Sequence, residues 1–388
     1  MNGCRIGISA LLFVVLCVPG MNGEVFATII RGVQVYGRDR EDAFPIIVRD
    51  SITEEGKGVD KGGYITIQFD AVIPDPVGLK IRFLHCSRDW QPDDNLFVQD
   101  AYHSTSHLLN YAPSPNGVHG YSFRYVNRFP DPDGIVRFEY SGNWIFRITN
   151  AAEDTVFDEG RFFVVDRLMP TKITVANDYL TENVSPLNQA HKVDVRVQLH
   201  DETEGIYFTT VDVYQNRRFH APFRVDLTDR DSYTFVDGEG RGYRIFSVRN
   251  ILPGNEYRTL DFSNANQYPN GAVVRSLEGA DQPRPYWRTG PDRNGTAVLN
   301  RFTGIHSDYL DVLMRLDMTE TDRRNVTSGG RGIFLVGAFN RWVPRGEDQL
   351  VYDEQERCLT VNEYLRRGIY DYQYVTGAWN EEQGIVEE

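Results

Sequence analysis

Three histidines lie close together in a polar stretch of the sequence and could in principle share a metal ion. They are His103, His107 and His119. Imidazole is a common zinc ligand, but a zinc site usually needs four ligands, and no cysteine or carboxylate pattern around these histidines supplies the rest. We therefore expect surface histidines here, with no metal site and no other bound cofactor.

Two adjacent carboxylates, Asp93 and Asp94, suggest either a calcium site or a paired-carboxylate catalytic site. They belong to the segment Gln91-Pro-Asp-Asp-Asn95, which has the composition of a turn. Asp and Asn side chains in turns commonly accept hydrogen bonds from nearby backbone N–H groups. The expected structure is therefore a turn, without a catalytic role.

Sequence motifs of the common enzyme classes do not occur in this chain. It has no Gly-x-Ser-x-Gly elbow, no His-Glu-x-x-His pair, no Walker loop and no Rossmann fingerprint. The glycine-rich segment Asp237–Gly242 lacks the strand-to-helix setting that a phosphate-binding loop needs. We predict that the protein is not an enzyme.

A turn near the C-terminus, Gly337-Ala-Phe-Asn-Arg-Trp342, has a pattern that points to sugar binding. It resembles the hallmark of the early-set, immunoglobulin-like carbohydrate-binding sandwiches found beside glycogen-processing enzymes. The resemblance implies a glucan site made of Trp342, Asn340 and Trp379. However, the neutral Gln373 stands where that family usually carries a basic residue in its closing strand. We therefore favour a packing role for Trp342 and keep carbohydrate binding as the alternative function.

Alternating apolar and polar residues recur through the whole chain and predict short β-strands. Examples are Ile65 to Phe69, Val136 to Tyr140, Val193 to Leu199 and Leu310 to Met318. In each of them the apolar residues have a period of two, which places them on one face of a strand. Turn-forming segments separate the strands. The expected fold is all-β, built as three consecutive immunoglobulin-like or early-set β-sandwiches.

Breaker-rich segments set the predicted domain boundaries. We expect a first sandwich over residues 28–166 and a second over residues 170–280. A linker or long loop follows over residues 281–295, and the third, early-set-like sandwich covers residues 296–380.

The N-terminus has the pattern of a secretion signal. Arg5 precedes a short apolar run that ends at Val18 and is followed by Pro19 and Gly20, so residues 1–23 are predicted to be a signal peptide. The bulky Leu16 argues against a lipid anchor on Cys17, although the sequence leaves that alternative open. The formal net charge of −14 argues against nucleic acid and anionic membrane surfaces as partners.

Two cysteines, Cys86 and Cys358, lie outside the predicted signal peptide. They are far apart in the sequence and lie in different predicted domains. A disulfide between them is one alternative for an exported protein, and two buried thiols are the one we favour.

Several segments in a fixed order resemble one family across residues 33–375. The most specific is His85-Cys-Ser-Arg-Asp-Trp90; Ser141-Gly-Asn-Trp144 and Tyr370-Asp-Tyr-Gln-Tyr-Val375 accompany it. Together they are similar to the Bacteroidetes family first catalogued as a domain of unknown function and later described as the plug protein of the type IX secretion system.

This resemblance implies a non-enzymatic periplasmic protein, associated with the outer membrane and monomeric when free. It would bind the periplasmic opening of the outer-membrane translocon β-barrel and seal it when idle, without inserting into the membrane itself. Aromatic and Arg residues on exposed loops are the usual anchors of such contacts. The partner-binding candidates are Trp90, Phe97, Tyr102, Tyr111, Tyr286, Trp287 and Arg288.

Overall fold

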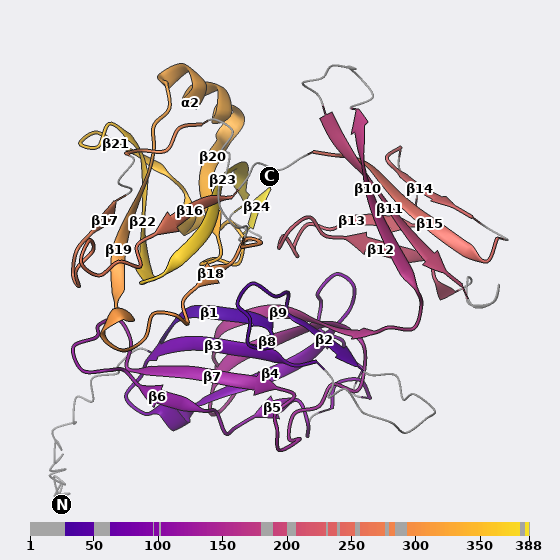
Figure 1. Ribbon diagram of the computed structural model, residues 1–388, viewed down its shortest axis with the longest axis horizontal. Helices are drawn as coiled ribbons and strands as arrows, with labels where there is room; N and C mark the ends of the chain where they lie inside the picture. Colours follow the sequence, from indigo (N-terminus) through magenta and orange to yellow (C-terminus); the bar gives the residue numbers. More distant parts are fainter. Residues whose placement is uncertain are drawn as a thin grey trace, which may run out of the picture.

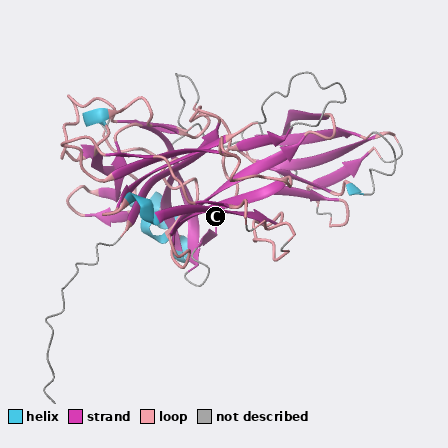
Figure 2. Cartoon of the chain, turned by 90° about the horizontal axis from the view of Figure 1, so that it is seen from below, coloured by secondary structure: helices cyan, strands magenta, loops and turns pink. Residues whose placement is uncertain are grey.

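A computed structural model gives the arrangement of the chain (Figure 1). It describes residues 28–49, 63–95, 97–100, 102–179, 189–199, 207–229, 232–238, 241–252, 257–275, 279–283, 293–380 and 385–387. Strands make up about half of these residues, and helical turns are limited to short pieces (Figure 2). The all-β prediction is therefore confirmed. The predicted signal peptide, residues 1–23, lies outside the described residues.

Two sheets form the first unit of the fold, which covers residues 29–166. One has the strand order β1-β3-β7-β6, and the other has the order β2-β9-β8-β4-β5, in which β2 runs parallel to β9. The strands are β1 (Ile29–Gly37), β2 (Ile46–Arg49), β3 (Ile65–Val72), β4 (Leu79–Cys86), β5 (Thr105–Ser106), β6 (Tyr111–Pro113), β7 (Phe123–Phe129), β8 (Gly142–Asn150) and β9 (Val156–Asp166).

The apolar faces of these two sheets share one core. At its centre Phe83 meets Phe129, Phe138 and Phe162 edge to face, with ring centroids 4.7–5.9 Å apart. Burying an aromatic side chain of this size contributes about 1.5–3 kcal/mol to folding. The alternating pattern predicted this core from Ile65, Ile67 and Phe69, all of which are buried in it.

One predicted strand of the first unit, Val136 to Tyr140, is wrong. The structure has irregular chain between β7 and β8, although Val136 and Phe138 are still buried. The carboxylate of Asp131 accepts hydrogen bonds from the backbone N–H groups of Ile135 and Val136. These backbone groups are satisfied by a side chain, so the segment fills the core without pairing in a sheet.

The second unit covers residues 171–251 and also has two sheets around a core. The larger sheet has the order β10-β11-β15-β14, and a hairpin of β12 and β13 packs against it. Val193, Val195 and Val197 are buried as predicted, whereas Arg196 and Gln198 are exposed. The strands are β10 (Thr171–Tyr179), β11 (Gln189–Gln198), β12 (Thr210–Val213), β13 (Phe223–Asp226), β14 (Thr234–Asp237) and β15 (Tyr243–Ile251).

The third unit, residues 258–387, is built around the long strand β23. Strands β16, β18, β20 and β24 all pair with β23, and the second sheet has the order β17-β19-β22-β21. The elements are β16 (Arg258–Asp261), β17 (Val274–Arg275), β18 (Ala297–Val298), β19 (Tyr309–Leu316), helix α2 (Glu320–Val326), β20 (Arg331–Gly337), β21 (Val351–Asp353), β22 (Cys358–Arg366), β23 (Ile369–Asn380) and β24 (Ile385–Glu387).

The predicted boundary at residue 280 is wrong, because β16 and β17 belong to the sheets of the third unit. The polar stretch that suggested a linker begins at Asp281, which lies inside this unit. The backbone of Asp281 forms hydrogen bonds with the backbone of Arg315 and Asp317. The Asp281 carboxylate accepts hydrogen bonds from the hydroxyls of Tyr372 and Tyr374 at 2.8 and 2.7 Å.

The first unit contacts both of the others (Figure 1). The third unit covers the outer face of the β1-β3-β7-β6 sheet, so β3 is buried on both faces. Thr66, Gln68 and Asp70 are only 1%, 3% and 3% exposed. The alternation in β3 predicted that one face of the strand would be polar. In the structure this polar face is covered by the third unit.

Candidate functional site at the junction of the three units

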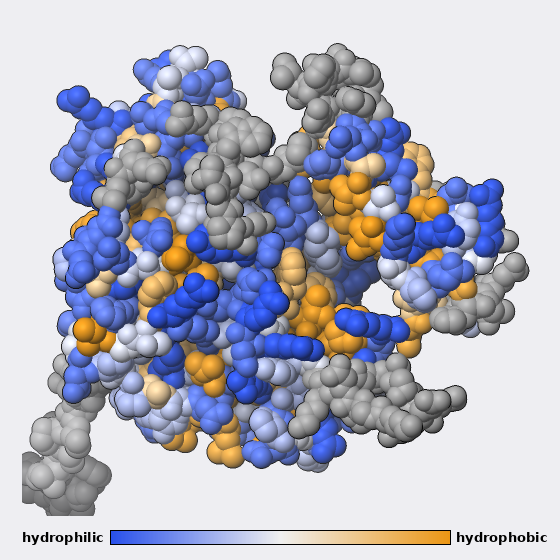
Figure 3. All heavy atoms as spheres, in the orientation of Figure 1, coloured by the Kyte–Doolittle hydropathy of each residue, from blue (hydrophilic) through white to orange (hydrophobic). Residues whose placement is uncertain are grey.

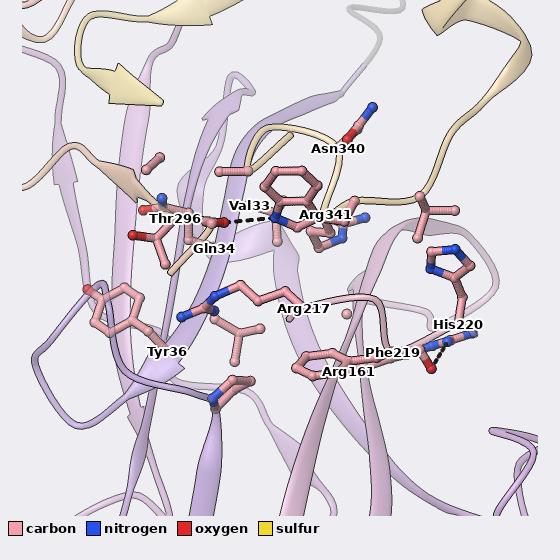
Figure 4. A pocket seen from close by; sticks show the side chains of 18 of the residues that line it. Val33, Gln34, Tyr36, Arg161, Arg217, Phe219, His220, Thr296, Asn340 and Arg341 are labelled. Carbon is pink, nitrogen blue, oxygen red and sulfur yellow. Dashed lines mark hydrogen bonds between the residues drawn. The ribbon is translucent and has the colours of Figure 1, made fainter. Parts of the chain in front are cut away.

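A cavity of about 260 Å³ lies where the three units meet (Figure 4). Strands β1 and β9 of the first unit form one wall. The loop between β12 and β13 of the second unit forms another, and the turn after β20 closes it from the third unit. Its polar lining residues include Gln34, Tyr36, Glu41, Glu159, Arg161, Arg217, His220, Thr296, Asn340, Arg341 and Arg345.

Arg217, in the β12–β13 loop, joins the three units at this cavity. Its Nε donates to the carbonyl of Asn294 at 2.9 Å, and its Nη2 donates to the carbonyls of Asp42 and Ala43 at 3.0 and 3.2 Å. The guanidinium also lies 4.9 Å from the ring centre of Phe44. Figure 4 shows the side chain lying across the cavity with Tyr36 beyond its guanidinium end. Burial lowers the pKa of Arg217 to about 10.

Arg161, on β9, lines the cavity from the first unit. Its Nη1 donates to the carbonyl of Phe219 at 3.3 Å, and its guanidinium lies 4.8 Å from the ring centre of Trp90. Burial lowers the pKa of Arg161. Burial, together with the charges of Arg218 and Arg161, also lowers the pKa of the neighbouring His220 to about 4. Several basic groups therefore lie close enough to repel one another.

Arg341 and Trp342 enter the cavity from the turn that the sequence singled out. Both have positive φ, 55° and 64°, so the turn needs two consecutive left-handed residues. The guanidinium of Arg341 binds both carboxylate oxygens of Asp158 on β9, at 2.6 and 3.2 Å. This paired contact fastens the third unit to the first.

The predicted glucan platform is not open to solvent in this turn. Trp342 is 3% exposed, donates from Nε1 to the carbonyl of Gly295 at 2.8 Å and packs against Tyr257. The Asn340 amide binds Gly337, Leu335 and Asp348. Trp379 is half-buried. A sugar would have to displace these contacts before stacking on Trp342, and the packing role favoured for Trp342 is confirmed.

Tyr309 forms the centre of the contact between the first and third units. Its hydroxyl donates to Asp70 at 2.9 Å, and Asp70 accepts both guanidinium hydrogen bonds of Arg124 at 2.8 Å. Gly32 and Gly120 make room for the ring. Both have positive φ, and a Cβ on either would lie 2.5–2.6 Å from an atom of Tyr309.

The His85–Trp90 element holds the second unit against the first. Trp90 is 8% exposed and packs against Phe163, which also contacts Phe219 of the second unit. The carboxylate of Asp89 accepts a hydrogen bond from Arg224 of the second unit at 2.6 Å. Ser87 Oγ accepts the Asp89 N–H at 3.3 Å. Trp90, a partner-binding candidate, is therefore used inside the molecule.

The remaining partner-binding candidates do not gather at this cavity. Phe97 and Tyr102 are each 89% exposed on the loop after β4, and Tyr111 on β6 is 44% exposed. Asn95 and Asp100 shape the loop by accepting backbone hydrogen bonds from Phe97 and Tyr102 at 3.0 and 2.9 Å. Tyr286, Trp287 and Arg288 lie outside the described residues.

The candidate metal ligands lie apart from one another. His103 contacts Asp100 at 2.6 Å, His107 is exposed, and His119 lies 3.6 Å from Asp308 of the third unit. Asp93 pairs with His85. Among the described residues, no three His, Cys, Asp or Glu side chains are placed to hold a metal ion. Cys86 and Cys358 are free and buried, as favoured from the sequence.

The fold and the junction together define a class of protein: a β-protein of several units held together by polar and aromatic contacts. Residues 30–166 match the family of the type 9 secretion system plug protein 1st domain. This part of the chain is similar to the type IX secretion system plug family, in agreement with the sequence motifs at His85–Trp90 and Ser141–Trp144.

A crystal structure of a hypothetical protein from Parabacteroides merdae has a similar fold. The TM-score is 0.69 at 16% sequence identity, over 90% of this chain and 85% of that chain. At this identity the likeness concerns the fold alone. A comparison with curated proteins gave no match.

Proposed function

We propose that the protein is a non-enzymatic plug or accessory protein of the type IX secretion system. It binds the periplasmic opening of the outer-membrane translocon barrel and seals it when no cargo is moving. The observation that carries this proposal is the plug-family match of the first unit. The proposal also places the protein in the periplasm, associated with the outer membrane.

The contacts between the units suit this role. Arg217, Arg341 and Tyr309 each bind a different unit from their own, and all three lie in or beside the junction. A body held in one shape can bind and leave an opening repeatedly with little rearrangement of its own. No helix within the described ranges is long and apolar enough to cross a bilayer.

Two surfaces are available for the barrel. Phe97 and Tyr102 project from the loop after β4, and exposed aromatic side chains are frequent anchors of protein interfaces. Apolar residues also gather on the visible face of the second unit (Figure 3). We assign the barrel contact to the Phe97–Tyr102 loop, because its aromatic side chains are the most exposed of the proposed anchors that the structure describes.

Co-purification of the full chain with the translocon barrel in detergent tests this function. We expect a complex that Phe97→Ala with Tyr102→Ala weakens by roughly tenfold or more. Tyr207→Ala is the matched control, because Tyr207 is 87% exposed on the second unit. Failure of the unaltered chain to bind any barrel subunit would contradict the proposed function. An unchanged affinity of the double variant would contradict the assigned loop.

A further inference from the structure

The lining of the junction cavity contains more arginines than carboxylates. Arg161, Arg217, Arg341 and Arg345 line it together with His220. This local charge contrasts with the whole chain, which has a formal net charge of −14. A basic cavity in an acidic protein requires an explanation beyond general surface composition.

The carboxylates around the cavity are already engaged. Glu41 accepts the backbone N–H groups of Leu299 and Asn300 at 2.8 and 3.1 Å. Glu159 accepts from Arg147 at 3.1 Å, and Asp158 is bound by Arg341. None of these three acids makes an ion pair with Arg161 or Arg217 in the described structure.

Arg161 has unused hydrogen-bonding capacity. A guanidinium has five N–H donors, and within the described part of the chain Arg161 makes one hydrogen bond, to the carbonyl of Phe219. A half-buried guanidinium that has lost part of its water shell gains most from an oxyanion, which can accept two parallel hydrogen bonds. The geometry therefore favours an anionic group beside Arg161.

The remaining lining of the cavity is largely apolar. Val33, Val35, Phe219, Ala297 and Trp342 contribute side chains from all three units. The cavity volume of about 260 Å³ is near the lower end of the range for small-molecule sites, which is about 300–1,000 Å³. A ligand of matching chemistry would be small and would combine an anionic head with an apolar body.

We propose that this cavity binds a small organic anion, with its carboxylate or phosphate head on Arg161 and its apolar body along Val35, Phe219 and Ala338. Because residues of all three units line the cavity, the bound ligand also stabilises the docking of the second unit. This site is independent of the proposed contact with the barrel, since the Phe97–Tyr102 loop does not line it.

Isothermal titration calorimetry on the full chain tests the site with defined probes. They are 4-phenylbutyrate, phenyl phosphate, the uncharged 4-phenylbutyramide, and acetate and inorganic phosphate as heads without an apolar body. We expect 4-phenylbutyrate or phenyl phosphate to bind roughly tenfold or more tightly than 4-phenylbutyramide. The same anion should also bind more tightly, by a similar factor, than acetate or inorganic phosphate, which carry the same head group without the apolar body. Whichever of 4-phenylbutyrate and phenyl phosphate binds more tightly identifies the preferred head group. The same ligand should raise the melting temperature of the protein.

Variants locate the binding. Arg161→Gln should weaken the aromatic anion by roughly tenfold, and Arg161→Lys should weaken it less, because a charge is retained. Ala338, just after β20, also lines the cavity. Ala338→Leu should weaken binding of the aromatic anion by occupying the cavity without removing a charge. Arg128→Gln is the matched control, since Arg128 is an exposed arginine of the first unit paired with Asp39.

Three results would overturn the proposal: no binding of any probe at millimolar concentration, equal binding of acid and amide, or unchanged affinity in both Arg161→Gln and Ala338→Leu. Circular dichroism of each variant shows whether it is folded. If Arg161→Gln does not fold, Ala338→Leu still tests the site. Barrel binding is measured separately, so loss of the plug function and loss of the anion site remain distinguishable.

Discussion

Tyr309 and Asp70 lie 239 residues apart in the sequence and are joined by a 2.9 Å hydrogen bond in the interior of the molecule. Asp70 belongs to β3 of the first unit, and Tyr309 begins β19 of the third. Arg124 neutralises Asp70 from the neighbouring strand β7. This contact turns the polar face of a sheet into a buried interface, and it explains why the first and third units form one body.

Replacing Tyr309 by Phe should destabilise the protein by about 1–2 kcal/mol. The substitution removes one donor from the buried carboxylate of Asp70 but leaves both hydrogen bonds from Arg124 in place. Urea denaturation followed by tryptophan fluorescence measures the change. Tyr207→Phe, at an exposed position, should change the free energy of unfolding by less than about 0.5 kcal/mol. Equal effects of the two substitutions would show that the Tyr309 hydroxyl contributes nothing.

A glycine pair separates steric from backbone effects at the same contact. Gly117 and Gly120 both have positive φ, so alanine strains the backbone at either position. Only at Gly120 would the new Cβ collide with Tyr309, whereas nothing lies within 4 Å at Gly117. Gly120→Ala should therefore cost at least about 1–3 kcal/mol more than Gly117→Ala in thermal or urea denaturation. Similar costs would mean that Tyr309 moves aside freely.

Arg217→Met should loosen the second unit while leaving the first and third units joined. The substitution keeps the apolar stem and removes three hydrogen bonds to carbonyls of the other two units. Each such bond contributes about 0.5–1.5 kcal/mol or more. Hydrogen exchange should accelerate in the β12–β13 loop and stay unchanged in β3 and β19.

Arg128→Met provides the comparison for Arg217→Met. Arg128 is an exposed arginine on β7 that pairs with Asp39 within the first unit. Its replacement should leave exchange in the β12–β13 loop unaltered. Faster exchange across all three units in Arg217→Met would indicate a general loss of stability and would argue against a local role for Arg217.

The strands could be predicted from the sequence because their signal is local. Val193 to Val197 and Leu310 to Leu316 alternate at the period of a strand, and both segments form strands with the expected faces buried. Val136 and Phe138 show the limit of this reasoning. Alternation reports which residues face the core, but sheet pairing also needs a neighbouring strand, and Asp131 satisfies the backbone there instead.

The junction could not be predicted because its residues come together only through the arrangement of the units. Nothing in the local sequence separates Arg217 from the adjacent Arg218, and Tyr309 reads as the ordinary start of a strand. The Trp342 turn was found because its Gly-x-Phe-Asn-x-Trp spacing is distinctive, and its packing role was correctly favoured. Trp90 was found for the same reason, but its ring is buried against Phe163 of the first unit, which in turn contacts Phe219 of the second unit.

The pH dependence of stability should contain a contribution from Glu363 on β22. Burial, followed by the nearby charges of Asp348 and Glu347, raises the pKa of Glu363 from its ordinary 4.5 to about 8. The folded state therefore keeps a proton that the unfolded chain releases above pH 4.5. This contribution to stability is fully present below pH 4.5 and is lost as the pH rises through 8.

Glu363→Gln, which stays neutral, should be more stable than the unaltered protein at pH 8.5 by about 1–2 kcal/mol. The difference should shrink toward zero at pH 4.5, as measured by urea denaturation across this range. Glu354→Gln, at an exposed position, should show no such trend, and a Glu363→Gln effect that is constant with pH would show that the carboxyl group ionises normally in the folded state.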